Sequence, residues 1–154
     1  MNYQKLFAYG PLPIRILAGI TLIIHGLPKL SNVAGSEVFF GKMGLPPDLA
    51  MLIGLLEVIG GVALIVGIFT RIASILFIIE MLGATIVAKL PKGFVSGYEF
   101  DLLLMSISIS LLLTGPGRAS IEWDLIKREL FPKAKEYMSQ QQQKTQGSTK
   151  QSSL

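Results

Sequence analysis

The sequence predicts an all-α integral membrane protein, a bundle of four helices that cross a lipid bilayer. Its 154 residues are 51% hydrophobic and only 16% charged, with a mean hydropathy of +0.57. Seven of the fourteen Lys and Arg residues lie from Arg118 onward, after the last apolar stretch. Crossing the hydrocarbon core takes about 20 mostly apolar residues. Four stretches meet this need, namely 12–30, 49–69, 72–88 and 98–114.

Proline and glycine mark the ends of these stretches. Pro11-Leu12-Pro13 opens the first and Pro46-Pro47 precedes the second, because a first helical turn tolerates proline. Gly115-Pro116-Gly117 ends the fourth. Only Thr70-Arg71 separates the second stretch from the third, so these two helices should form an antiparallel hairpin.

The second stretch tests whether a charged residue prevents insertion. Glu57, near its middle, costs about 2.5–3.5 kcal/mol, whereas each Leu, Ile, Val or Phe contributes about 0.3–0.6 kcal/mol in favour. Thirteen such residues lie between positions 49 and 69, so the apolar contribution is the larger. In the first stretch, Arg15 and Lys29 lie near the ends, where long side chains reach the interface.

The positive charges orient the protein. Four spans place both termini on one side, and cytoplasmic loops carry an excess of Lys and Arg. One face would carry eight of these residues: Lys5, Arg15, Arg71, Arg118, Lys127, Arg128, Lys133 and Lys135. The other would carry four: Lys29, Lys42, Lys89 and Lys92. We therefore expect a multi-pass protein of the cell membrane with cytoplasmic N and C termini.

Two further segments have the composition of short interfacial helices. Residues 36–43 combine Phe39 and Phe40 with charged neighbours and should lie on the outer face. Residues 120–131 should form a cytoplasmic interfacial helix with Ser120 as its cap. The Gln- and Ser-rich residues 139–154 cannot bury a core and are expected to be a disordered tail. The membrane domain would then cover residues 1–138.

Helical spacing predicts which polar residues face the bundle. In the first span, a stripe at spacings of four and three residues carries two glycines that allow close helix approach: Arg15, Gly19, Leu22, Gly26 and Lys29. In the second span, Gly54, Glu57 and Gly61 share a stripe. At 1.5 Å per residue, Glu57 would lie about 12 Å below the outer end, and Glu80 about 12 Å from the inner end of the third span.

Ionisable residues at membrane depth are expensive unless they face the bundle interior, which makes them functional candidates. By depth, five of these residues lie in the outer half of the membrane: His25, Lys29, Glu57, Glu99 and Asp101. Their grouping predicts a polar binding cavity that is open to the outside. Arg15 and Glu80 would lie in the inner half. Glu57 and Glu80 are the candidate catalytic carboxylates. Alternatively, the charges are structural, Lys29 pairing with Glu99 or Asp101 and Arg15 with a lipid phosphate.

The residue types limit the cofactors. The chain has no cysteine and one histidine, so it carries no haem, iron–sulfur or zinc signature, and we expect no metal site. A quinone fits these limits, because it needs an apolar cleft, donors such as His25 or Lys29 and a carboxylate that exchanges protons. The cofactor is otherwise unknown. The basic tail lacks any nucleic-acid recognition motif, so no nucleic-acid partner is expected beside the lipid bilayer.

Several short motifs follow one another between Arg15 and Trp123. They are Arg15 with Gly19, His25-Gly26 leading to Lys29, Gly44-Leu45-Pro46, Glu57 with Gly60-Gly61, Gly67 with Thr70-Arg71, and Gly115-Pro116-Gly117 with Ser120. Their order resembles that of the DoxX family of small four-span membrane proteins. The resemblance implies a four-helix membrane bundle. Through the DoxD subunit of thiosulfate:quinone oxidoreductase, it also implies a link to sulfur oxidation and the quinone pool. Other members resemble membrane partners of thiol-stress enzymes.

Three functions are compatible with these observations. The first is a membrane subunit of a quinone-linked oxidoreductase, related to sulfur, thiosulfate or thiol stress, that works with a partner subunit or as a homo-oligomer. The second is a non-catalytic anchor or assembly protein whose interior charges are structural. The third is a pathway for a small solute or protons.

Overall fold

A computed structural model describes residues 9–117 and 119–122, which form helices and turns and contain no strand. Four helical segments are long and apolar enough to cross a membrane, which confirms the predicted four-helix membrane bundle: Pro11–Ser31, Leu49–Val66, Thr70–Lys92 and Phe94–Thr114. Most of the predicted helix 120–131 and the tail 139–154 lie outside the described residues.

The helices follow one another along the chain as α2 (Pro11–Ser31), α3 (Val33–Lys42), α4 (Leu49–Val66), α5 (Thr70–Ala84) and α6 (Glu99–Thr114). Three short pieces connect α5 to α6: the π-helix η1 (Thr85–Lys89), the 3-10 helix η2 (Leu90–Lys92) and the π-helix η3 (Phe94–Tyr98).

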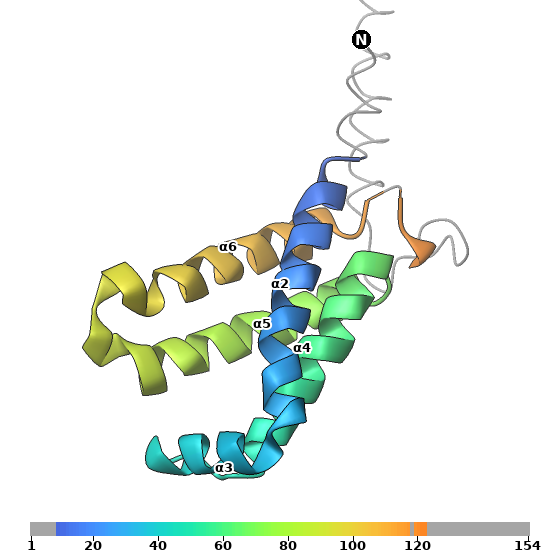
Figure 1. The fold of residues 1–154 in the computed structure, drawn as a ribbon. Helices are drawn as coiled ribbons and strands as arrows, with labels where there is room; N and C mark the ends of the chain where they lie inside the picture. Colours follow the sequence, from blue (N-terminus) through green and yellow to red (C-terminus); the bar gives the residue numbers. More distant parts are fainter. Residues whose placement is uncertain (1–8, 118, 123–154) are drawn as a thin grey trace, which may run out of the picture.

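The long helices pack as two pairs, α2 with α4 and α5 with α6 (Figure 1). The turn from α4 to α5 is short, as the sequence predicts, and Gly67 enters it with φ +73°. Two amides, those of Gly67 and Ile68, donate to the carbonyl of Ala63 and close the end of α4. The expected pairing of α4 with α5 is nevertheless secondary, because α5 diverges from α4 beyond this turn and packs mainly against α6.

The predicted glycine stripes form the contact between α2 and α4. A Cβ atom on Gly19 would lie 2.5 Å from the carbonyl oxygen of Gly61, and one on Gly61 would lie 2.7 Å from that of Gly19. A Cβ on Gly26 would lie 2.9 Å from the carbonyl oxygen of Gly54. The two backbones therefore touch along both stripes, as in other closely packed membrane helices.

Gly61→Ala should consequently destabilise the bundle by about 1–3 kcal/mol, because the new methyl group meets a backbone carbonyl that cannot move aside. Gly83→Ala is the matched control. Gly83 faces open space on α5, where alanine should cost nothing and could stabilise the helix by up to about 1 kcal/mol. Thermal unfolding in detergent compares the two variants, and equal melting temperatures would contradict the close contact.

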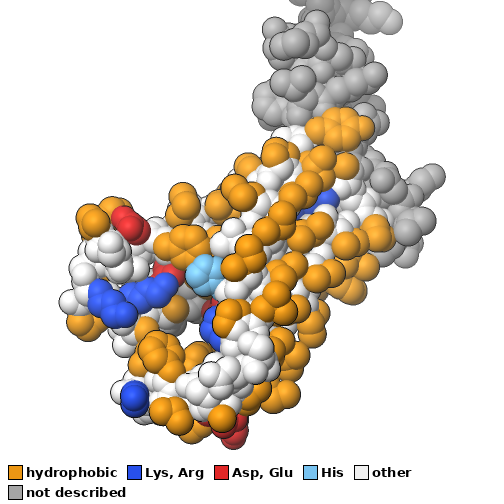
Figure 2. All heavy atoms as spheres, in the orientation of Figure 1, with side chains coloured by type: hydrophobic (Ala, Val, Ile, Leu, Met, Phe, Trp, Pro, Cys, Tyr) orange, Lys and Arg blue, Asp and Glu red, His pale blue; other side chains and the backbone are white. Residues whose placement is uncertain are grey.

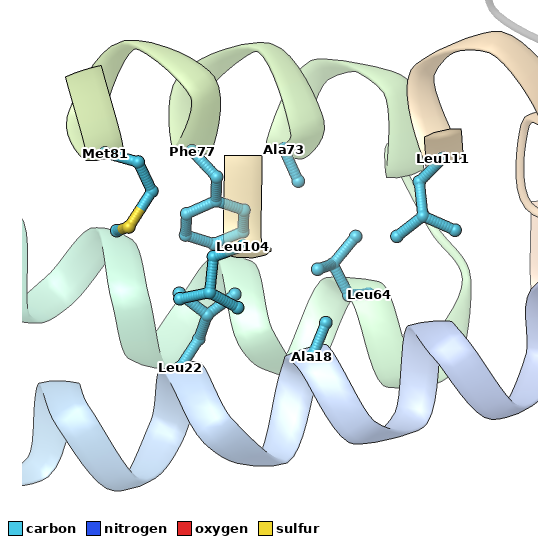
Figure 3. Close-up of a cluster of buried hydrophobic side chains, with 8 residues drawn as sticks. All are labelled: Ala18, Leu22, Leu64, Ala73, Phe77, Met81, Leu104 and Leu111. Atoms are coloured by element: carbon cyan, nitrogen blue, oxygen red, sulfur yellow. The ribbon is translucent and has the colours of Figure 1, made fainter. Parts of the chain in front are cut away.

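Both helix pairs contribute to one core, shown in Figure 3. Phe77 of α5 is 1% exposed and its ring packs over Gly60 of α4, where a Cβ would lie 2.5 Å from the ring atom Cζ. The buried apolar cluster around it contains Ala18, Leu22, Leu64, Ala73, Met81, Leu104 and Leu111. Large apolar side chains such as Leu17, Ile59 and Leu113 point outward from the bundle, where lipid rather than water would surround them.

The short helix α3 lies across the ends of α2 and α4, at what we name the α3 end of the bundle (Figure 1). The Asn32 side chain accepts a hydrogen bond from the Gly35 amide at 3.1 Å and caps this helix. Phe40 is buried, whereas Val38 and Phe39 are exposed. The helix expected over residues 36–43 is thus confirmed, with an earlier start. The opposite end, where residues 9 and 122 lie, is named the terminal end.

Candidate functional site

Polar side chains gather around a hollow at the α3 end, between α3 and the α5–α6 pair (Figure 2). The rest of the visible surface is mainly hydrophobic. We define the hollow by six residues, which come from α2, α4, α5, η1 and α6: His25, Lys29, Glu57, Glu80, Lys89 and Asp101. Five of them were expected to be polar cavity residues or catalytic carboxylates, and Lys89 was not.

An ion pair links α2 to α4 on one side of the hollow. The Lys29 Nζ atom lies 2.5 Å from Glu57 Oε2 and donates a second hydrogen bond, at 3.0 Å, to the carbonyl of His25. Glu57 is only 4% exposed. The predicted pairing of Lys29 with Glu99 or Asp101 is therefore wrong, because α2 packs against α4 along the glycine stripes and brings Glu57 closer.

A second ion pair closes the α5–α6 hairpin on the other side. The Lys89 Nζ atom lies 2.5 Å from Asp101 Oδ1, and the Thr85 hydroxyl donates to Asp101 Oδ2 at 3.3 Å. Asp101 is 1% exposed. Neither Lys89 nor Thr85 was predicted as a site residue. Their four-residue spacing, which places both on one helix face beside a loop, was the available signal.

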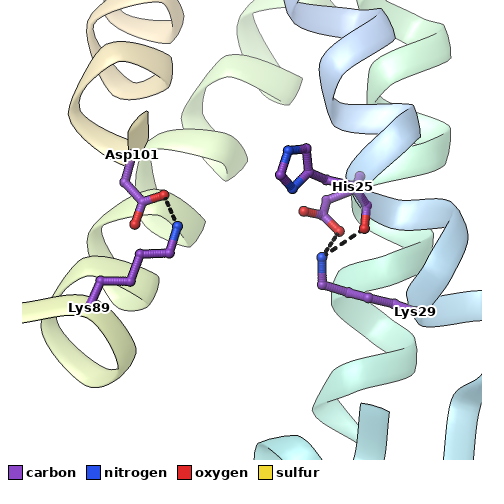
Figure 4. A network of polar contacts seen from close by, with 5 residues as sticks. His25, Lys29, Lys89 and Asp101 are labelled. Atoms are coloured by element: carbon purple, nitrogen blue, oxygen red, sulfur yellow. Dashed lines mark hydrogen bonds and ion pairs between the residues drawn. The ribbon is translucent and has the colours of Figure 1, made fainter. Parts of the chain in front are cut away.

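An aromatic contact bridges the two helix pairs. The His25 ring of α2 stacks on the Phe100 ring of α6, with centroids 5.1 Å apart and planes at 25°. In Figure 4, the His25 ring points into the space between the two ion pairs. Part of the imidazole is exposed and accessible. A flat polar ring, two ammonium groups and several carboxyl groups therefore converge on one hollow.

Glu80 belongs to the same cluster. Its carboxyl group interacts electrostatically with those of Glu57 and Asp101 and with the ammonium group of Lys29. The expectation that Glu80 lies with Arg15 in the inner half is wrong. The third span runs from Thr70 to Lys92, so Glu80 is near its middle, where it interacts with Glu57 of α4.

Glu99 lies outside the hollow. It is exposed at the first turn of α6, where its Oε1 atom accepts a hydrogen bond from the Ser96 amide at 3.0 Å. This bond supports the η3 turn, in which Ser96 has φ +60°. The structure therefore gives Glu99 a local capping role, and Glu99→Gln is a suitable control substitution for the buried carboxylates.

Arg15 lies at the terminal end and is 1% exposed. Its Nη1 atom donates to the carbonyl of Pro116, and its Nη2 atom donates to the carbonyls of Ala119, at 2.5 Å, and Ile65, at 3.3 Å. The alternative that Arg15 pairs with a lipid phosphate is therefore wrong. The side chain instead fastens the segment after α6 to α2 and α4, far from the hollow.

The Lys29–Glu57 pair makes a testable prediction. Lys29→Glu would place a second negative charge against a buried carboxylate and should cost about 2–4 kcal/mol of stability. Adding Glu57→Lys should restore part of it, whereas adding Asp101→Lys should not. Thermal unfolding of the three proteins measures the difference. If Asp101→Lys restored the stability of the Lys29→Glu protein and Glu57→Lys did not, the result would contradict the observed pairing.

Comparison with known proteins agrees with this architecture. The DoxX family profile matches residues 10–90. A Bacillus subtilis protein named "Putative oxidoreductase CatD" is 43% identical over 112 residues, which cover 73% of this chain and 84% of that protein. The Escherichia coli inner membrane proteins YqjF and YphA are 31% and 29% identical, over 81% and 79% of this chain and 98% and 99% of their own lengths.

No solved structure gives a significant match. The family profile nevertheless covers more than half of the chain, and the Bacillus subtilis relative aligns over most of both proteins. The four membrane-spanning helices and the two inner membrane relatives agree with this assignment. The chain therefore belongs to the DoxX family of multi-pass membrane proteins.

Proposed function

We propose that this chain is the membrane subunit of a quinone-linked oxidoreductase and that the hollow binds the quinone head group. A quinone is a flat ring with two carbonyl oxygens that accept hydrogen bonds. The hollow offers a stacking surface in Phe100 and donors in His25 and Lys29. Ligand sites of this kind combine aromatic surface with a few polar groups that fix orientation.

The observation that carries the proposal is the position of the His25 ring, which stacks on Phe100, between the Lys29–Glu57 and Lys89–Asp101 pairs (Figure 4). Purely structural ion pairs would not require an exposed imidazole ring between them. The stack also joins α2 to α6, so a ring bound beside it would contact both helix pairs at once. A carboxyl group for proton exchange, Glu57, lies beside the donor Lys29.

We propose that the electrons come from another protein. Reduction of a quinone takes two electrons and two protons, and the chain has no cysteine that could form a redox-active thiol pair. We propose a partner subunit that oxidises a sulfur compound or thiol, the chemistry implied by the family resemblance. The printed name of the Bacillus subtilis relative, an oxidoreductase, supports the broader class.

Quinone titration of the purified protein in lipid nanodiscs tests the proposal. Calorimetry with a short-tailed quinone should show saturable binding. His25→Ala should weaken it by about tenfold to a hundredfold, the loss of one stacking contact and one hydrogen bond. Glu99→Gln, outside the hollow, should bind as the wild type does. A folded wild-type protein that binds no quinone would contradict the proposal and favour the anchor function.

We further propose that both termini lie in the cytoplasm, which places the hollow at the outer side of the membrane. The excess of Lys and Arg on the terminal side supports this orientation. Reporter fusions after Leu154 should be active in the cytoplasm, and fusions within residues 89–97 should be active outside. The reverse pattern would place the α3 end, and the hollow, on the cytoplasmic side.

A further inference from the structure

The charges of the hollow do not balance. It contains three carboxyl groups, from Glu57, Glu80 and Asp101, and two ammonium groups, from Lys29 and Lys89. Each ammonium nitrogen lies 2.5 Å from one carboxylate oxygen, Lys29 from Glu57 and Lys89 from Asp101. Of these three carboxyl groups, that of Glu80 is therefore the one that forms no ion pair with either lysine. An uncompensated charge at membrane depth is costly.

The position of Glu80 indicates how this cost is avoided. Its carboxyl group interacts electrostatically with that of Glu57. Two ionised carboxylates that interact in this way repel each other, and a proton on one of them removes the repulsion. The Oε2 atom of Glu80 is buried and has no hydrogen-bond partner among the described residues. A neutral acid tolerates that environment better than an anion.

The other groups that face this pair do not supply the missing positive charge. On α2, Lys29 already pairs with Glu57, and the His25 ring stacks on Phe100. On η1, Lys89 pairs with Asp101 of α6. Two lysines thus compensate two carboxylates, and the third carboxyl group is compensated by a proton.

We propose that Glu57 and Glu80 hold one proton between them and that this pair is the proton donor for a ligand bound in the hollow. The second part rests on the proposed function. When two electrons arrive from the partner subunit, one quinone carbonyl oxygen takes the proton of the pair. The other oxygen takes a proton from water at the open side of the hollow, which completes the hydroquinone. The pair then regains its proton from that water.

Infrared spectroscopy detects this proton without any ligand. The wild-type protein at neutral pH should show the carbonyl stretch of a protonated carboxylic acid, and the band should shift in heavy water. Both Glu80→Gln and Glu57→Gln should lose it, because two carboxylates then face two lysines. Lys29→Met should strengthen the band, since one more carboxyl group would lack a counter-charge. Glu99→Gln should leave it unchanged.

The proposal would be overturned if the wild-type spectrum minus the Glu80→Gln spectrum lacked the band. It would also be overturned if the band persisted in both glutamine variants. The two variants replace a carboxyl by an amide of the same shape, and Lys29→Met provides a third comparison should either fail to fold. Quinone titration of the same samples separates the two ideas. A band without quinone binding supports the shared proton and contradicts only the proposed function. Binding without a band contradicts the shared proton alone.

Discussion

Arg15→Ala should destabilise the protein by about 3–5 kcal/mol, more than the loss of either hollow ion pair. The change removes the donors of three backbone carbonyls, those of Ile65, Pro116 and Ala119, in a site where Arg15 is 1% exposed. A buried carbonyl left without a donor costs about 1–3 kcal/mol. The segment after α6 would also lose its Arg15 contacts with α2 and α4, although the Glu122 amide would still donate to the Gly67 carbonyl. Thermal unfolding in detergent measures the loss.

Two variants accompany this measurement. Arg15→Lys keeps the charge but has no planar fork that could reach three carbonyls, so its stability should fall between those of the wild type and Arg15→Ala. Lys42→Ala removes an exposed cation at the end of α3 and should change stability by less than about 0.5 kcal/mol. A melting temperature of Arg15→Ala equal to that of Lys42→Ala would show that water satisfies these carbonyls and that the attachment is not structural.

Glu57→Gln should leave the protein folded and inserted but abolish quinone-linked turnover of the assembled complex. Glutamine keeps the shape of the side chain and can still accept a hydrogen bond from Lys29, and Glu80 remains nearby to balance the lysine charge. It cannot give up or take a proton. General acid–base catalysis typically contributes about a hundredfold to ten-thousandfold to a rate, so the loss should be of that order.

The structural alternative makes the opposite prediction for the same variant. If Glu57 only joins α2 to α4, a glutamine that hydrogen-bonds Lys29 should preserve both folding and turnover. The Glu99→Gln variant controls for loss of a negative charge at the same end of the bundle, because Glu99 is exposed and outside the hollow. Normal turnover of a well-folded Glu57→Gln protein would return this residue to a structural role.

The sequence was informative wherever a local pattern determines structure. Apolar length identified the four spans, and the spacing of Gly19 and Gly61 with their neighbours identified the faces on which α2 and α4 meet. Both follow from helix geometry alone, since residues three or four apart share a face. The burial of Arg15 and Glu57 follows from the same stripes.

The partners of the charged residues could not be predicted in this way. Counting residues from the end of a span gives the depth of a side chain but not the neighbouring helix that it faces. Lys29 and Asp101 lie at the same end of the bundle but do not pair with each other. The contact between α2 and α4 places Lys29 beside Glu57, and the α5–α6 hairpin places Lys89 beside Asp101. Glu80 was misplaced because it lies near the middle of its span, where depth assigns a residue to neither half.

Photoaffinity labelling with a quinone that carries a reactive group on its ring is the sharpest test of whether the hollow binds a quinone head group. We expect labelled peptides from α2 around His25 and from α6 around Phe100, because these rings stack beside the proposed site. Excess unlabelled quinone should suppress the labelling. Labels spread over lipid-facing residues such as Leu17, Ile59 and Leu113, and insensitive to competitor, would contradict a specific site in the hollow.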